Sequence, residues 1–257
     1  MCNCSKDKVN MKIAFDGRYA EGNLVGIGKY TENLVSGLID RGVECVVFYS
    51  KKPKVAFRES EQVILDSSNR YYYEQVLLPV SLKEKKVDIY HALGNIGISP
   101  FSPVPTVLTV HDVIPLEIRG YFDELNFPFI SRSSYFLRLT SSCFFAKKII
   151  TDTNYVKRQL VQKLGVSGKK ITVVNPGVKI SGKETNLSFK LTKKRYILNH
   201  GGIDKRKNLE RLLDAFKTVG NLFPQLKLVI IGDNPHLKLK LQEKAKSLGL
   251  INKIVFT

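Results

Sequence analysis

Short apolar runs alternate along the chain with stretches in which apolar residues recur every three or four positions. The helical spacing is clearest in three stretches, which run from Ile27 to Leu38, from Val156 to Leu164 and from Leu209 to Val219. Strands that alternate with helices predict βαβ units, that is, α/β domains in which helices cover both faces of a parallel sheet. The predicted strands are Lys12–Phe15, Glu44–Tyr49, Gln62–Leu65, Val87–His91, Thr106–Val110, Lys148–Thr151, Ile171–Val174, Tyr196–Asn199, Lys227–Ile231 and Lys253–Phe256.

A polar, weakly patterned stretch divides the chain into two α/β units. The predicted boundaries are a disordered extension over 1–10, a first domain over 11–180, a linker over 181–194 and a second domain over 195–257. Because Met11 begins a clean strand, either Met1 or Met11 could be the true start. The second domain has three predicted strands, whereas a doubly wound sheet usually has five or six, so we expect roughly a hundred residues to be missing. A complete small domain is the alternative.

Positive charge is the main compositional signal. The chain has 41 Lys and Arg against 23 Asp and Glu, a formal net charge of +18. The excess is densest after residue 180, where 16 basic residues meet 6 acidic ones. This balance suits an anionic membrane surface or a phosphorylated ligand, and simple solubility is the alternative. We do not expect a nucleic-acid partner, because the basic residues are not interleaved with aromatic ones and no known module is present.

The cysteines and the chain start indicate a cytoplasmic protein. The spacing of the four cysteines matches no zinc or haem pattern, and Cys45 and Cys143 lie in apolar segments as small core residues. The first ten residues are polar, unlike a signal peptide. The most apolar long stretch, 135–146, is too short and too polar to span a bilayer. Peripheral binding at the inner face of the membrane remains open.

The first candidate site is the loop "GNLVGIGKY", between the first predicted strand and the first predicted helix. Gly26 and Gly28 allow close backbone approach, and a helix N-terminus offers free N–H groups to a phosphate. The dinucleotide fingerprint needs a third glycine where Thr31 stands, and the P-loop needs four residues, not five, between Gly22 and Gly28. The loop is therefore a phosphate loop of another kind or an ordinary turn.

The second candidate site is "TVHDVIP", at the end of a predicted strand. His111 could donate to a phosphate or a sugar hydroxyl, and Asp112 could orient its ring. The alternative is that the pair caps the following turn. His91 also closes a strand, and we interpret it as a partly buried histidine that could instead line the same cleft.

The third candidate site is "GGIDKRKNLERLLDAF", where glycines, cations and a helix start coincide at a strand end. Gly201 and Gly202 end the strand, and Arg206 and Lys207 precede the helix. Arg offers a bidentate fork for phosphate oxygens and Lys a point charge, so this turn is predicted to bind a phosphate. A solvated basic turn is the alternative. Two such loops in two units suggest a diphosphate ligand held between them.

Five segments in order resemble retaining glycosyltransferases of family 4, also known as group 1 or mannosyltransferase-like enzymes. The segments are "GIGKYTENLVSGL", "VHDVIP", "TDTNYVKRQLVQKLGVSGKKITVVNPGV", "YILNHGGIDKRKNLERLLDAF" and "LKLVIIGDN". The resemblance covers residues 11–257 and implies a GT-B fold, with a Rossmann-like acceptor domain followed by a Rossmann-like donor domain.

The resemblance implies retaining transfer of a hexose, with mannose as a candidate, from a nucleotide-diphosphate sugar to a glycan or lipid-linked acceptor in polysaccharide synthesis. It implies that no cofactor or metal is needed, because cations of the protein stabilise the departing diphosphate. His111 would lie beside the transferred sugar, with Asp112 as the second candidate catalytic residue. The residues expected at the donor diphosphate are Gly26, Gly28, Gly202, Arg206 and Lys207.

Two departures from the family pattern qualify this expectation. The family has a later motif of two glutamates, seven residues apart, and this chain ends before it. His200 stands where the family usually has an apolar residue. We therefore expect the chain to be inactive alone, or to need a partner chain that completes the donor domain. A module that binds glycans or anionic lipids without catalysis is the competing interpretation.

Overall fold

The structure is a computed structural model that describes residues 11–22, 24, 26–54, 56–118, 121, 132–178, 195–232 and 234–257. The chain forms two compact units, Met1–Lys179 and Ile180–Thr257. The extension predicted over 1–10 and the linker predicted over 181–194 lie outside the described residues.

A seven-stranded parallel sheet forms the centre of the first unit. Its strand order is β3-β2-β1-β4-β5-β6-β7, and every neighbouring pair is parallel. The sheet therefore has a switch point between β1 and β4, where the order reverses. Its strands are β1 (Lys12–Asp16), β2 (Glu44–Tyr49), β3 (Glu61–Ile64), β4 (Ile89–Ala92), β5 (Thr106–Val110), β6 (Lys148–Thr151) and β7 (Ile171–Val173).

Helices connect these strands. They are η1 (Arg18–Ala20), α1 (Ile27–Ile39), α2 (Arg70–Tyr72), the π-helical turn η2 (Tyr73–Leu77), α3 (Leu78–Glu84), α4 (Ile114–Glu117), α5 (Arg132–Phe145), α6 (Asn154–Leu164) and η3 (Gly168–Lys170). The C-cap expected at Gly165 is confirmed, since this residue ends α6 with a left-handed φ of 65°.

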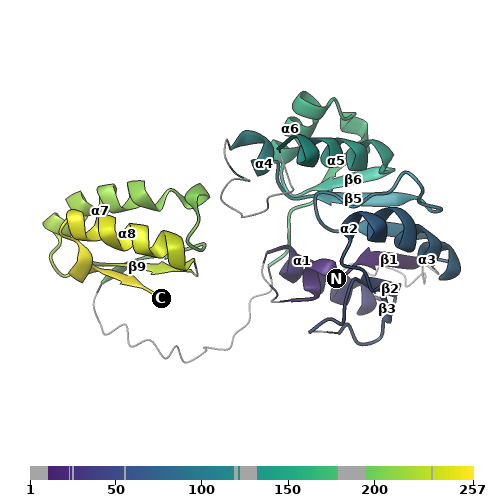
Figure 1. The fold of residues 1–257 in the computed structure, drawn as a ribbon, viewed down its shortest axis with the longest axis horizontal. Coiled ribbons are helices and arrows are strands. Elements are labelled where there is room, and N and C mark those ends of the chain that lie inside the picture. The colour runs from purple at the N-terminus through teal and green to yellow at the C-terminus, as the bar shows by residue number, and fades with distance from the viewer. Residues whose placement is uncertain are drawn as a thin grey trace, which may run out of the picture. The chain divides into compact units, whose positions relative to one another are not determined.

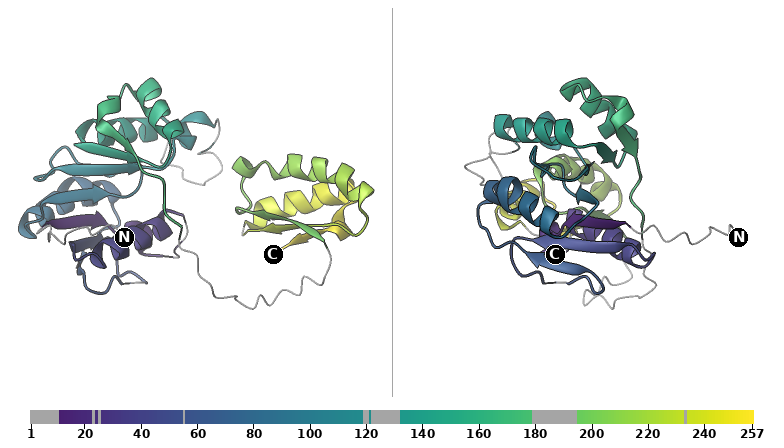
Figure 2. Two further views of the ribbon diagram at one scale, coloured as in Figure 1. Left: turned by 180° about the vertical axis from the view of Figure 1, so that it is seen from behind. Right: turned by 90° about the vertical axis from the view of Figure 1, so that its right-hand side faces the viewer.

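Alternation along the strands places apolar side chains on both faces of the sheet. On β1, Ala14 faces one core with residues of α3, α5 and α6, whereas Phe15 faces a second core with Val35 of α1. Figure 1 and Figure 2 show this sheet between its two helical layers. The prediction of a parallel sheet with helices on both faces is confirmed for this unit.

The buried cysteines belong to these cores, as expected. Cys45 on β2 and Cys143 on α5 are both buried and free. Burial raises the pKa of Cys45 to about 11 and that of Cys143 to about 12. Both thiols are therefore protonated at neutral pH, which suits structural residues rather than nucleophiles.

The second unit has a three-stranded parallel sheet in the order β10-β9-β8. Leu213 and Phe216 of α7 and Leu241 of α8 pack with Leu228 and Ile230 of the central strand in one core. Among the described residues of this unit, both helices therefore cover the same face of the sheet (Figure 1). Its elements are β8 (Tyr196–His200), η4 (Lys205–Lys207), α7 (Leu209–Leu222), β9 (Lys227–Ile231), α8 (Pro235–Ser247), η5 (Ile251–Lys253) and β10 (Ile254–Phe256).

Candidate functional site

Three strand ends of the first unit meet at His111, which follows β5. Its side chain is mostly buried, with 12% exposed. Its Nδ1 lies 2.9 Å from Oδ2 of Asp152, which follows β6, and its Nε2 lies 2.9 Å from the carbonyl oxygen of Leu93, which follows β4. Both partners are acceptors, so a protonated ring donates a hydrogen bond from each nitrogen. These contacts fix the orientation of the ring.

Asp152, and not Asp112, orients the imidazole of His111. Asp112 accepts a hydrogen bond from the backbone N–H of Ile114 at 3.1 Å and so stabilises the turn that begins α4. The expectation that Asp112 orients the ring is wrong, because consecutive residues at a strand end point in different directions, whereas Asp152 follows the neighbouring parallel strand. A catalytic role for Asp112 stays a prediction.

Two further residues support His111. The ring of Tyr30 on α1 meets the imidazole edge to face, with 4.7 Å between the ring centroids. The side-chain oxygen of Asn95 accepts a hydrogen bond from the backbone N–H of His111 at 2.8 Å. The site thus combines residues from the first helix with residues from the ends of strands on one side of the switch point, where parallel sheets bind ligands.

His91 is a buried structural residue, as we interpreted it. It is 7% exposed, and its Nε2 lies 2.8 Å from Oγ1 of Thr109. Burial, and to a lesser extent the charge of His111, lowers the pKa of His91 to about 4. The ring is therefore neutral at physiological pH.

The two predicted phosphate-loop glycines of the first unit each have a structural role. Gly26 is the N-cap of α1, with φ of 52°, a backbone conformation that favours glycine. A Cβ on Gly28 would lie only 2.5 Å from the carbonyl oxygen of Tyr19, so the first turn of α1 packs against that backbone. Contact of these glycines with a phosphate stays a prediction.

The predicted phosphate turn of the second unit is organised by Asp204. The Nε of Arg206 lies 3.0 Å from both carboxylate oxygens of Asp204, and its Nη2 lies 2.8 Å from Oδ2. The hydrogen bond from the Arg206 side chain holds the pKa of Asp204 below its usual value. The Lys207 side chain lies over Gly201, since a Cβ there would meet the lysine Cε at 3.2 Å. Both cations are therefore placed at the end of β8.

Gly232 supports this turn from the neighbouring strand. A Cβ on Gly232, which follows β9, would lie 2.5 Å from the backbone nitrogen of Ile203 and 2.6 Å from Cα of Gly202. Only a glycine allows so close an approach of the two strand ends. Gly202 itself has φ of 80°, a conformation that side chains rarely adopt.

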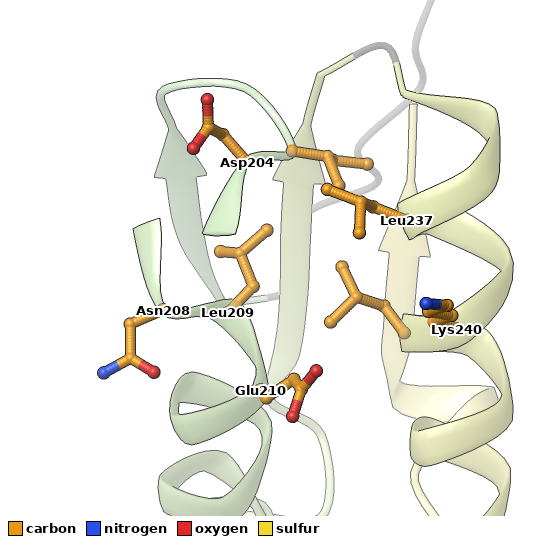
Figure 3. A pocket seen from close by; sticks show the side chains of 8 residues that line it. Asp204, Asn208, Leu209, Glu210, Leu237 and Lys240 are labelled. Carbon is orange, nitrogen blue, oxygen red and sulfur yellow. The ribbon is translucent and has the colours of Figure 1, made fainter. Parts of the chain in front are cut away.

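A cavity of about 260 Å³ adjoins the turn. Figure 3 shows its lining side chains, which come from the turn after β8, the first turn of α7 and the facing side of α8. Asp204 lines it, whereas Gly202, Arg206 and Lys207 do not. Asp204 therefore touches both the cavity and the predicted phosphate-binding cation Arg206. The cavity is lined by Ile203, Asp204, Asn208, Leu209, Glu210, Leu237, Lys240 and Leu241.

Sequence reasoning missed a buried ionic network beside the switch point. Arg18 forms a bidentate pair with the fully buried Asp16, at 2.9 and 2.7 Å, and its Nη2 also donates to Glu74 at 2.8 Å. Arg70 and Arg138 each donate to Glu74 at 2.8 Å. The segment "FDGR" at the end of the first predicted strand carried a signal, because a charged pair closes an apolar run there.

Neither a metal centre nor a membrane span is found in the part of the chain that the structure describes. No group of three or more His, Cys, Asp and Glu is placed there to hold a metal ion. No helix among these residues is both long and apolar enough to cross a bilayer. Catalysis without a metal stays a prediction.

Two protein families match the sequence. Glycosyltransferase Family 4 matches residues 25–181, and Glycosyl transferases group 1 matches residues 183–257. No curated protein sequence matches the chain.

Solved structures share the fold at low sequence identity. A glycosyltransferase from Rickettsia africae ESF-5 is 16% identical with a TM-score of 0.61, over 97% of this chain and 68% of that one. WaaG, a glycosyltransferase involved in lipopolysaccharide biosynthesis, is 17% identical with a TM-score of 0.68, over 95% and 69%. The catalytic domain of starch synthase IV from Arabidopsis thaliana, bound to ADP and acarbose, is 10% identical with a TM-score of 0.63, over 96% and 73%. The expected GT-B fold class is confirmed.

Proposed function

The chain belongs to glycosyltransferase family 4, and we propose that it transfers a hexose from a nucleotide-diphosphate sugar, with retention, to a glycan or lipid-linked acceptor. The names of two similar structures support a role in glycan synthesis, since WaaG acts in lipopolysaccharide biosynthesis and starch synthase IV binds ADP. Mannose is the sugar that we propose to test first.

The arrangement of Arg206 carries this proposal. A guanidinium already fixed by Asp204 loses little side-chain entropy when a phosphate binds, and Lys207 adds a second charge at the same strand end. We propose that these cations, with the backbone at Gly202, bind the donor diphosphate and stabilise the negative charge that develops as it leaves. No metal is then required for that step.

In the first unit, His111 is proposed to contact the sugar that is transferred. Its orientation by Asp152 and Leu93 supports this role, because a polar group that acts on a reacting centre must be held within a narrow geometry. Asp152 is then a positioning residue. Peripheral contact with an anionic membrane, where a lipid-linked acceptor resides, is proposed from the net charge of +18.

A transfer assay tests the proposed function. The full chain is incubated with GDP-mannose and several UDP- and ADP-sugars and with a lipid-linked acceptor extract, and the glycosylated product is detected by mass spectrometry. Product with any of these donors would overturn the expectation that the chain is inactive alone. Such product should keep the anomeric configuration of the donor in the NMR spectrum and should be lost in Arg206→Gln. An inverted product would overturn retention, and full activity of Arg206→Gln would overturn the assigned donor site.

A further inference from the structure

A second cavity opens at the strand ends of the first unit, on the other side of the switch point from His111. Its volume is about 240 Å³. Its lining follows β1, β2 and β3 and continues onto α2 and η2. Two arginines, three serines and two tyrosines form the lining, with no acidic residue: Arg18, Tyr19, Ser50, Ser67, Ser68, Arg70 and Tyr73.

The two arginines are held in place by carboxylates that do not line the cavity. Arg18 is paired with Asp16 and Glu74, and Arg70 donates from Nε to Glu74. These contacts occupy Nε and Nη2 of Arg18, and Arg70 uses Nη2 for the hydroxyl of Tyr19 at 3.3 Å. Nη1 of each guanidinium makes no hydrogen bond to the described residues. Both arginines therefore retain donors for an anion.

Tyr73 supplies an independent observation. Its side chain is 1% exposed and lines the cavity, and its hydroxyl finds no hydrogen-bond partner among the described residues. Its ring carries the guanidinium of Arg18 at 4.3 Å from the centroid. This hydroxyl therefore has an unused donor and acceptor that a ligand oxygen could satisfy, as do the buried hydroxyls of Tyr49 and Tyr90.

Tyr19 connects the cavity to the surroundings of His111. A Cβ on Gly94 would clash with the ring of Tyr19, so this ring packs directly on the Gly94 backbone. The neighbours of Gly94 are Leu93 and Asn95, which both hydrogen-bond His111. Tyr19 therefore lies between the cavity and the residues that hold His111.

We propose that this cavity binds a phosphoryl group of the acceptor, so that the acceptor of the proposed transferase is a phosphorylated or diphosphate-linked glycan carrier. The identification of the ligand as the acceptor rests on the proposed function, whereas the anion site itself does not. The fixed arginines and the hydroxyls of Ser68 and Tyr73 can recognise phosphate oxygens, and no carboxylate lines the cavity itself. The hydroxyls of Ser50 and Ser67 are already used, because they donate to Glu21 and to the carbonyl oxygen of Asn69.

The experiment is a titration of the full chain followed by two-dimensional ¹H–¹⁵N NMR. One arm adds inorganic phosphate, and the other adds vesicles of phosphatidic acid, with phosphatidylcholine vesicles as the reference. The amide signals of Ser67 and Ser68 report this cavity, whereas those of Gly201 and Gly202 report the proposed donor turn. One spectrum therefore shows separately whether an anion binds at the cavity and whether it binds at the donor turn.

Three variants complete the design. Arg70→Gln removes a guanidinium that is 41% exposed, so folding should tolerate the change, and Ser68→Asp places a carboxylate in the lining. Arg158→Gln is the matched control on the exposed side of α6. We expect saturable shifts at Ser67 and Ser68, binding weakened by about 10-fold or more in the first two variants, and less than about 2-fold in the control.

Saturation by inorganic phosphate supports a soluble or carrier-linked phosphate, and saturation by phosphatidic acid vesicles alone supports a lipid headgroup. Either result supports the proposal if the binding is weakened in Arg70→Gln. Absence of saturable shifts in both arms, or equal binding by wild type, Arg70→Gln and Ser68→Asp, would overturn it.

Discussion

Replacing Glu74 by glutamine should sharply destabilise the first unit. The glutamate is 2% exposed and accepts hydrogen bonds from Arg18, Arg70 and Arg138. Glutamine keeps the shape of the side chain but removes the negative charge and turns an NH₂ group toward a guanidinium. Arg18 would then keep only the carboxylate of Asp16, and Arg70 and Arg138 would lose the carboxylate that they share.

The magnitude follows from the burial of the partners. Removing one member of a buried ion pair costs about 3–5 kcal/mol. The Arg70 side chain is 41% exposed and can return to water, whereas that of Arg18 is 12% exposed and cannot. We therefore expect Glu74→Gln to lower the free energy of unfolding by about 3 kcal/mol. For a unit of this size, that loss lowers the Tm by about 6–12 °C.

The pH dependence of stability provides a second, independent test of the role of Glu74. Burial raises the pKa of Glu74, but the charges of Arg70, Arg18 and Arg138 outweigh it and hold the pKa below its usual value of 4.5. A carboxylate whose pKa is lowered by folding stabilises the fold fully at pH values above its pKa in the unfolded chain. This contribution is lost as the pH falls through its pKa in the folded chain. The difference in free energy of unfolding between wild type and Glu74→Gln should therefore become smaller below about pH 4.

Urea unfolding followed by circular dichroism, at pH 7 and at lower pH, measures both effects. Glu117→Gln is the matched control, because Glu117 is at the surface and pairs with Lys163 at 3.0 Å, an interaction worth less than about 1 kcal/mol. If Glu74→Gln is destabilised no more than Glu117→Gln, or if its difference from wild type grows at low pH, the network does not support the fold as argued.

Three further predictions follow from single contacts. Where transfer is detected, Asp152→Asn should lower its kcat by about 100-fold, because a neutral amide is a weaker acceptor for Nδ1 of His111 than the carboxylate that orients the ring, whereas Asp112→Asn should cost less than about 5-fold; equal losses in steady-state kinetics would contradict the assignment. Gly232→Ala should displace the turn after β8 and weaken binding of a nucleoside diphosphate by at least about 10-fold in calorimetry, and unchanged affinity would show that the turn does not bind it. The lowered pKa of His91, about 4, means that the unfolded chain binds the extra proton. Stability should therefore fall by up to about 3 kcal/mol as the pH drops from 6.5 to 4, and an equal fall in His91→Gln, measured by urea unfolding, would refute that origin.

The strands were the most predictable part of the fold. Thr106–Val110 and Lys148–Thr151 have the predicted bounds, because short apolar runs between polar turns leave little choice of limits. His111 was found for the same reason, as a titratable residue at the end of such a run. The position of a polar residue at the end of a predicted strand is thus the main clue to a site that a single sequence provides.

The partners of these residues were not predictable in the same way. Asp152 lies 41 residues from His111 in the chain, and only the pairing of β5 with β6 brings them together. Glu74 lies 56 residues from Arg18, on a π-helical turn that no simple periodicity indicates. Asp112 is adjacent to His111 in the sequence, and a single sequence offers no sign that Asp152 is the residue that contacts the ring.

The most direct test of the account is calorimetric titration of the full chain with UDP, GDP and ADP. We expect at least one nucleoside diphosphate to bind without added metal, and Arg206→Gln with Lys207→Gln to weaken that binding by about 100-fold or more, since two charge-assisted contacts are lost. Binding that is unaffected by the double substitution, or no binding of any nucleoside diphosphate, would contradict the proposal that this turn holds the donor.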